Sequence, residues 1–219
     1  LKTGLARATV QRIVNALEKE NFVQAGAKGV RPGWGIRQLS DISGPNISHE
    51  IRPFLYSLYE KTKETVDLST LYDGTVLFLD RFISDQDIRS VPDVGIQYPA
   101  YSMANGKSLL SKLSNDDISA LYAECILERK TSSTICDFNI LIGQIKDIRE
   151  GGFSYDIEEH AIGSCAIGLP LITNSKMNLA ISVVIPSCRF DSQRHLVEEA
   201  LRECVEKCNI RLKELQVSK

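Results

Sequence analysis

Apolar and polar positions alternate with a helical period at the start of the chain, and a glycine-rich stretch follows. Between residues 5 and 23, apolar side chains recur every three or four positions, at Val10, Ile13, Val14 and Leu17. This spacing predicts an amphipathic helix with one buried apolar face, and Asn21 is a plausible stop. Residues 22–35 place glycines between apolar residues, which predicts a β-hairpin with basic residues near its tip.

The polar side of this first helix carries side chains that can contact DNA. Arg7, Thr9, Gln11 and Arg12 occupy its leading face, where they can reach base edges or phosphates in a major groove. Gly4, just before this helix, is typical of the tight turn that joins the two helices of a helix-turn-helix. The pattern alone fits an ordinary amphipathic surface helix equally well. The candidate DNA-binding residues are Arg7, Ala8, Thr9, Gln11, Arg12, Lys28 and Arg31.

A second helical pattern follows a break near residues 40–46. Apolar residues recur from Ile47 to Tyr59, and Pro53 is expected either to kink this helix or to start another. We therefore predict three parts, over residues 1–40, 41–52 and 53–219, of which the second is a connecting helix. The stripe formed by Ile47, Ile51, Phe54 and Leu58 is too apolar for water, so we expect it to support self-association.

The remainder of the chain mixes strand and helix patterns. Residues 65–72 and 75–83 flank Asp73-Gly74, a strong hairpin signal. Helices are predicted at 105–113, at 115–123 with Ser114 as the cap, at 137–150 and at 192–215. Further strands are predicted at 153–158, 165–171 and 177–185. The fold class is therefore α+β, with a mainly antiparallel sheet.

The charge distribution supports a division between the two ends of the chain. Residues 1–40 hold seven basic and two acidic residues, a net +5, whereas the rest holds 19 basic and 26 acidic residues, a net −7. A basic module on an acidic body is typical of a nucleic-acid-binding end attached to a ligand domain. A charged, solvated surface is the simpler alternative.

Composition narrows the class of protein. The hydrophobic fraction is 43% and the charged fraction 25%, as in ordinary globular proteins. We find no apolar run long enough for a membrane span and no signal peptide. The six cysteines are scattered, without the spacing of a disulfide framework, so a reducing cytosol fits best.

These motifs together resemble the IclR-type (isocitrate lyase regulator) family of bacterial transcription regulators. The matching stretches are Gly4-Leu5, Arg7 to Ile13, Glu64 to Val66, Asp80 to Phe82, Pro99-Ala100, Asn105 to Lys107, Glu150 to Asp156, Glu158 to His160 with Gly163, and Ala180 to Ser182. The resemblance implies a winged helix-turn-helix over 1–40 that binds double-stranded operator DNA, a linker helix over 41–52 and a profilin-like or GAF-like effector-binding domain over 53–219. It implies a homodimer or a dimer of dimers. It also implies that the first helix of the DNA-binding domain, and most of the second, precede Leu1.

The same resemblance supplies a candidate effector site. Ala104 and Asn105 begin a helix whose free backbone N–H groups favour a carboxylate, so a small organic acid is expected there. Asp156 and Ser182 are carried over as further contacts, although Asp156 alternatively caps a strand end. The family often has a cysteine one residue after the position of Cys165, and a serine two after Ser182. Here these positions hold Ala166 and Val184, which favours a more apolar, aromatic or longer-chain acid.

Other chemistry is less well supported by the residues. Residues 105–108 end like a phosphate-binding loop, but Tyr101 stands where the leading glycine is needed. Neither His160 with its acidic neighbours nor Cys204 with Cys208 forms a convincing zinc set, so we expect no metal and no cofactor. A stand-alone GAF-like sensor, or an enzyme that uses Cys165 as its nucleophile, is the alternative to a regulator.

Overall fold

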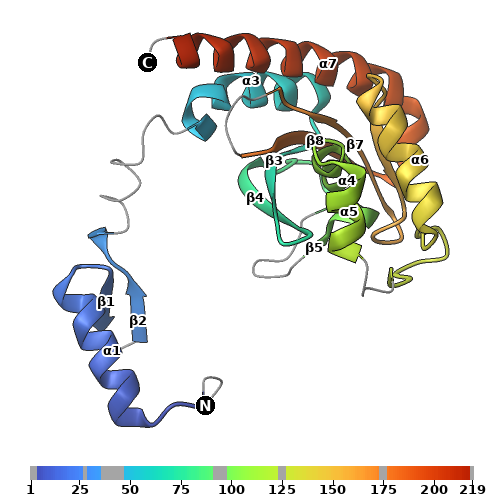
Figure 1. Cartoon of the computed structure of the whole chain (residues 1–219). Coiled ribbons are helices and arrows are strands. Elements are labelled where there is room, and N and C mark those ends of the chain that lie inside the picture. Colours follow the sequence, from blue (N-terminus) through green and yellow to red (C-terminus); the bar gives the residue numbers. More distant parts are fainter. Residues whose placement is uncertain are drawn as a thin grey trace. The chain divides into compact units, whose positions relative to one another are not determined.

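The computed structural model describes residues 4–26, 29–35, 47–90, 98–122, 127–172 and 177–217. The chain divides into two compact units, residues 1–50 and 51–219 (Figure 1). Each unit is described by itself below.

The first unit contains the predicted helix and hairpin. Helix α1 (Arg7–Lys19) ends just before Asn21, whose φ of 59° takes the chain out of the helix. Strands β1 (Val23–Gly26) and β2 (Gly29–Pro32) pair antiparallel. The Glu18 carboxylate accepts the Ala25 N–H at 2.9 Å and so ties the helix to the hairpin. The predicted order of helix and hairpin is confirmed.

The predicted burial of the apolar face of α1 is wrong for the described residues. No side chain of α1 is buried, and Ile13 is 46% and Leu17 39% exposed. Two four-residue strands offer too little surface to cover a 13-residue helix. The described residues therefore leave Ile13 and Leu17 open to another segment or chain, whereas Val10 and Val14 on the same face are half-buried.

Helix α3 (Ile47–Thr62) is one continuous helix with Pro53 inside it, so no second helix starts at the proline. It extends well beyond residue 52, the predicted end of the linker helix; residues 41–46 lie outside the described residues. Ile51, Leu55 and Leu58 are at most 1% exposed. Of the predicted stripe, Ile51 and Leu58 are therefore covered by the chain itself, whereas Ile47 and Phe54 are half-buried. A role of this stripe in self-association stays a prediction.

The second unit is built on a six-stranded sheet in the order β5-β4-β3-β8-β7-β6. Its strands are β3 (Thr65–Tyr72), β4 (Thr75–Phe82), β5 (Tyr98–Pro99), β6 (Ser154–Ile157), β7 (Ser164–Pro170) and β8 (Leu179–Pro186). All pairings among the described strands are antiparallel. At the β3–β4 turn Asp73 and Gly74 both have positive φ, 46° and 70°, as a two-residue hairpin requires. The α+β class and its antiparallel sheet are confirmed.

Helices cover both faces of this sheet (Figure 1). Helix α3 and the long α7 (Ser187–Val217) run together over one face. The short η1 (Ala100–Ser102), α4 (Ala104–Leu110), α5 (Asn115–Tyr122) and α6 (Phe138–Arg149) belong to the other side, where a buried cluster includes Ala180 of β8. Ser182 and Val184 share the orientation of Ala180, because side chains alternate along a strand.

Most predicted elements are present with shifted ends. The Ser114 hydroxyl accepts the Asp117 N–H at 3.1 Å, which confirms the predicted cap of α5. Helix α7 begins at Ser187 rather than at residue 192. Strand β5 and η1 were not predicted, since elements of two and three residues show no periodicity.

Candidate functional site

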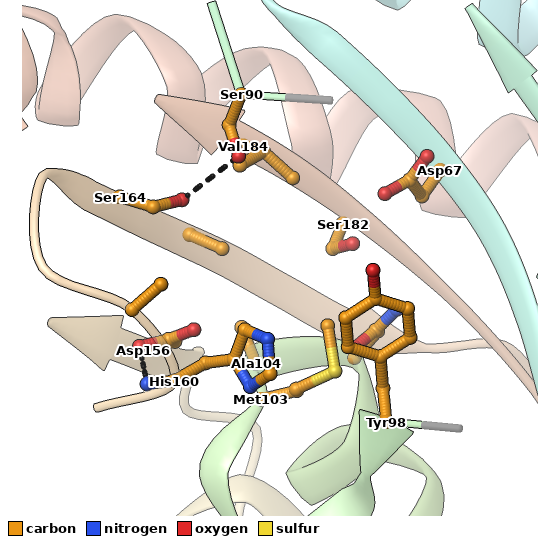
Figure 2. A pocket seen from close by; sticks show the side chains of 13 residues that line it. Asp67, Ser90, Tyr98, Met103, Ala104, Asp156, His160, Ser164, Ser182 and Val184 are labelled. Carbon is orange, nitrogen blue, oxygen red and sulfur yellow. Dashed lines mark hydrogen bonds between the residues drawn. The ribbon is translucent and has the colours of Figure 1, made fainter. Parts of the chain in front are cut away.

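A cavity of about 190 Å³ lies between the sheet and the start of α4 (Figure 2). Six residues proposed from the sequence line it: Ala104, Asn105, Asp156, Ala166, Ser182 and Val184. They come from four separate elements, α4, β6, β7 and β8, which only the folded sheet brings together. An engineered cavity of about 150 Å³ in another protein holds benzene, so this one has room for a ligand of one ring.

Small side chains on the sheet leave the space for the cavity. The register sets Asp156 opposite Ala166, and Ala166 opposite Val184. A neighbouring row sets Ser182 opposite Gly168. Alanine, serine and glycine at these positions make a hollow that larger residues would fill.

Gly168 also allows α4 to approach the sheet. A Cβ at this position would lie 2.7 Å from Ser154 Oγ and 3.1 Å from the carbonyl of Ala104. The Ser154 hydroxyl donates to the Ala104 carbonyl at 2.7 Å, which fixes the first residue of α4 over β6 and β7. The glycine and this hydrogen bond therefore set the position of the Ala104 backbone in the cavity.

The start of α4 offers donors that the described part of the chain leaves unused. No acceptor is found there for the backbone N–H groups of Ala104 and Asn105. The Asn105 Oδ1 accepts the N–H of Gly106 at 2.9 Å. This orients the carboxamide, and within the described residues its buried Nδ2 has no partner. A ligand acceptor placed here would satisfy several donors at once.

Asp156 forms one polar end of the cavity. Its Oδ1 accepts the N–H groups of Glu159 and His160 at 2.8 and 3.3 Å. Burial, together with repulsion from the Glu159 carboxylate, raises the pKa of Asp156 to about 7. The side chain thus switches between acceptor-only and donor-capable forms near neutral pH.

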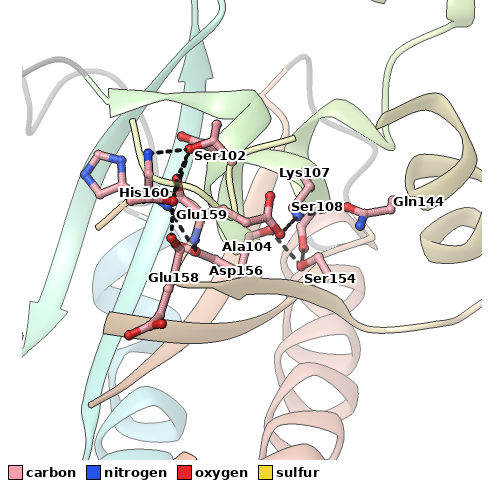
Figure 3. A network of polar contacts seen from close by, with 12 residues as sticks. Ser102, Ala104, Lys107, Ser108, Gln144, Ser154, Asp156, Glu158, Glu159 and His160 are labelled. Carbon is pink, nitrogen blue, oxygen red and sulfur yellow. Dashed lines mark hydrogen bonds and ion pairs between the residues drawn. The ribbon is translucent and has the colours of Figure 1, made fainter. Parts of the chain in front are cut away.

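A buried ion pair between Lys107 and Glu159 lies next to Asp156 (Figure 3). Lys107, whose side chain is fully buried, donates to Glu159 Oε1 at 2.7 Å and to Gln144 Oε1 at 2.8 Å. Burial raises the pKa of Glu159, and the Lys107 charge opposes that rise. The pair joins α4 to the segment that follows β6, which carries His160 and whose N–H groups bind Asp156.

Asp67 lies in the same cavity and has its own cation. Its Oδ1 pairs with Nε of Arg81, and the side chain is 1% exposed. Burial raises the pKa of Asp67, while the Arg81 guanidinium acts against that rise. Arg81 in turn lies over the ring of Phe78, 4.2 Å from its centroid.

An aromatic pair closes part of the cavity wall. The rings of Tyr98 and His160 meet edge to face, with centroids 5.0 Å apart. Burial, followed by the nearby Lys130 charge, lowers the pKa of His160, which favours the neutral imidazole at pH 7. With Met103, these rings give the cavity a partly apolar lining.

The structure places Cys165, the seventh residue proposed from the sequence, away from this cavity. It neighbours Ala166 on β7, so its side chain points to the opposite face of the sheet, toward α7. Burial, the largest cause, raises the pKa of the Cys165 thiol to about 11. A thiol held in its protonated form is a poor nucleophile.

Sequence reasoning missed seven lining residues: Asp67, Ser90, Tyr98, Met103, His160, Ala161 and Ser164. Asp67 had a usable signal, because an acid stands alone inside a run of strand-forming residues. From the sequence, His160 is rejected as a metal ligand and is not considered as a residue that lines a cavity. The others carry no local pattern and reach the cavity through long-range packing.

The proposed DNA contacts lie on the first unit. Arg7, Ala8, Thr9, Gln11 and Arg12 occupy the first two turns of α1 and are exposed. Arg31 is exposed on β2, and Lys28 lies outside the described residues. No acidic residue occupies the first turn of α1, and no side chain caps it. Its free N–H groups and neighbouring cations therefore suit an anion such as a phosphate.

Two searches of the described residues were negative. In those ranges no group of three or more histidine, cysteine or acidic side chains is arranged to hold a metal ion. None of the helices described combines the length and apolar character needed to cross a bilayer.

Comparison with known proteins identifies the family of the chain. Residues 40–210 match the family model for the bacterial transcriptional regulator IclR C-terminal domain. The chain belongs to the IclR family. It is 36% identical over 200 residues to the HTH-type transcriptional regulator TtgV of Pseudomonas putida, covering 90% of this chain and 76% of that protein. It is also 36% identical over 208 residues to the HTH-type transcriptional regulator Rv1719 of Mycobacterium tuberculosis, covering 94% and 80%.

Solved structures of IclR-family proteins share the fold. An IclR homologue from Microbacterium hydrocarbonoxydans, complexed with 4-hydroxybenzoate, aligns with a TM-score of 0.84 at 20% identity, over 96% of this chain and 87% of that one. The Thermotoga maritima IclR aligns with a TM-score of 0.74 at 23% identity, over 96% and 87%. At these identities the likeness establishes the fold alone.

Proposed function

We propose that this IclR-family chain is a transcription regulator that binds operator DNA through its first unit and a small organic acid in the cavity under α4. The observation that carries the proposal is the convergence of Ala104, Asn105, Asp156 and Ser182 on one cavity sized for a single ring. The curated relatives that match most of this chain are named as regulators.

The unused donors at Ala104 and Asn105 favour a carboxylate as the anchoring group of the effector. Two N–H groups directed at one carboxylate form charge-assisted hydrogen bonds. The alanine and valine at positions 166 and 184 provide an apolar wall, which favours an aromatic acid over a very small one. The related structure complexed with 4-hydroxybenzoate supports the same ligand class.

The DNA-binding proposal rests on the exposed leading face of α1. Arg7 and Arg12 extend from a helix start that lacks acidic residues, and Arg31 adds a cation on the hairpin. Each phosphate neutralised adds roughly −0.9 to the slope of log K against log salt. If either α1 arginine binds a guanine, its change to alanine costs about 1–3 kcal/mol.

Assembly as a homodimer or a dimer of dimers belongs to the same proposal. Its support is the exposed apolar surface of the described residues, which includes Ile13 and Leu17 of α1 and Leu77 and Leu79 of β4. Light scattering at micromolar concentration tests this. A clean monomer mass would contradict it.

The alternative of a GAF-like enzyme receives less support. Its proposed nucleophile, Cys165, is buried, keeps its proton and faces away from the cavity. A cysteine nucleophile needs a lowered thiol pKa or an adjacent base. Catalysis that is lost on Cys165→Ala would reverse this judgement.

Thermal unfolding with benzoates tests the effector site without DNA. A ligand at a hundredfold excess over Kd stabilises the fold by about 2.7 kcal/mol, which shifts the unfolding temperature measurably. Ala104→Leu should fill the space needed by the carboxylate and abolish the shift. Asn105→Ala, which keeps the backbone N–H, should weaken the shift less. No shift with any aromatic or aliphatic acid, or an unchanged shift in Ala104→Leu, would refute the proposed site.

A further inference from the structure

Asp67 occupies the end of the cavity away from Asp156. Figure 2 shows its carboxylate on the side of Ser182 and the Tyr98 ring, with Asp156 and His160 on the other side. The sheet register agrees, because Asp67 on β3 lies directly opposite Ser182 on β8. The cavity therefore has two separate polar ends joined by small and apolar side chains.

A bulge in the β3–β4 hairpin gives Asp67 its partner. Counting back from the turn in an unbroken register would set Asp67 opposite Asp80, so that two carboxylates faced each other. The register instead shifts between Leu68 and Ser69, which sets Asp67 opposite Arg81. The Arg81 cation compensates the charge of the buried Asp67 carboxylate, so this carboxylate can remain in the wall of the cavity as a hydrogen-bond acceptor.

Only one oxygen of this carboxylate is occupied by the described residues. Nε of Arg81 pairs with Oδ1, and no donor within those ranges is found for Oδ2 of Asp67. An ionised carboxylate accepts hydrogen bonds and cannot donate them. The free oxygen therefore favours a ligand group that carries a proton to share.

We propose that Asp67 is a specificity-determining residue that accepts a hydrogen bond from a hydroxyl group of the effector. This deepens the proposed function and rests on it: the carboxylate of the effector lies at Ala104 and Asn105, and its ring hydroxyl lies at Asp67. The preferred ligands are hydroxylated aromatic acids. Acids with no donor on the ring are disfavoured because they leave Oδ2 of Asp67 without a hydrogen bond, and acids with a second carboxylate there are disfavoured because that carboxylate repels Asp67.

Calorimetric titration of the wild-type protein with matched benzoates is the first measurement. The probes are benzoate and the 3- and 4-substituted hydroxybenzoates and fluorobenzoates, since fluorine is small and carries no proton. We expect one hydroxybenzoate to bind roughly 10- to 100-fold tighter than its fluoro counterpart, as for a hydrogen bond to a charged group. Equal affinities for the hydroxy and fluoro compounds would overturn the proposal, and this comparison needs no variant.

Asp67→Asn and Asp80→Asn form a matched pair for the second measurement. In Asp67→Asn the amide oxygen stays with Arg81 and the NH₂ group faces the cavity, so the preference for hydroxyl should fall by roughly tenfold. Asp80→Asn makes the same change in a residue paired with Arg52 on the other face of the hairpin, and should keep the wild-type preference. An unchanged preference in Asp67→Asn, or no binding of any benzoate to wild type, would overturn the inference alone, whereas no thermal shift with any aromatic or aliphatic acid would overturn the proposed effector site as well.

Discussion

Replacement of Lys107 by methionine should destabilise the second unit strongly. The methionine fills similar space but leaves the Glu159 carboxylate without its cation, and Glu159 Oε2 already lacks a partner among the described residues. Removing one member of a buried ion pair costs about 3–5 kcal/mol. Because Lys107 is fully buried and Glu159 nearly so, we expect a loss within that range at neutral pH.

The pH dependence of this loss follows from the direction of the Glu159 shift. Its pKa is raised in the folded protein, and the loss of Lys107 removes the cause that opposes the rise. The folded state then binds more protons than the unfolded state, so stability falls as pH rises above the unfolded pKa. The cost of Lys107→Met should therefore shrink as pH falls and Glu159 becomes protonated.

Urea denaturation of three variants, one of them a control, measures these effects. The double variant Lys107→Met with Glu159→Gln should be more stable than Lys107→Met alone, because no unpaired charge remains. Lys61→Met removes an exposed cation from Glu203 on α7 and should change stability little. A loss under about 1 kcal/mol in Lys107→Met, equal to that of the exposed control, would refute the reasoning.

Three further predictions concern the cavity. Gly168→Ala should destabilise the fold by about 1–3 kcal/mol and weaken benzoate binding, because its Cβ would displace the Ala104 backbone. The control Gly143→Ala has open space around its Cβ and should stabilise α6 slightly. Urea denaturation measures the stability of both variants, and calorimetry measures their benzoate affinity. An anionic effector should raise the pKa of Asp156 above its value of about 7 in the ligand-free protein, so benzoate affinity should fall as pH rises through that value. The same dependence of affinity on pH in Asp156→Asn would contradict this. Cys165→Ala should leave benzoate affinity unchanged in calorimetry, since the thiol faces α7; a tenfold loss would place it in the site.

The fold was largely predictable because its elements are long and periodic. The Asp73-Gly74 turn fixed the β3–β4 hairpin, and the Ser114 and Asp137 positions marked helix starts that the structure caps with those side chains. The burial of individual helix faces was not predictable. Ile51 and Leu58 of α3 are buried, whereas no side chain of α1 is buried, and the periodicity of the sequence describes both helices identically.

The cavity could be predicted only in part for a related reason. Ala104, Asn105, Asp156 and Ser182 came from resemblance, and strand alternation then separates Ala166, inside, from Cys165, outside. Asp67 was missed because its role depends on the bulge, which shifts the register by one position and cannot be counted from the turn. Tyr98 lies on a strand of two residues that leaves no pattern.

A crystal structure of the protein with a hydroxybenzoate tests the central claim most directly. We predict that the ligand carboxylate lies within hydrogen-bond distance of the Ala104 and Asn105 backbone nitrogens, with its ring against Ala166 and Val184. Ligand bound outside this cavity, or with its carboxylate turned toward Asp67 or Asp156, would contradict the account.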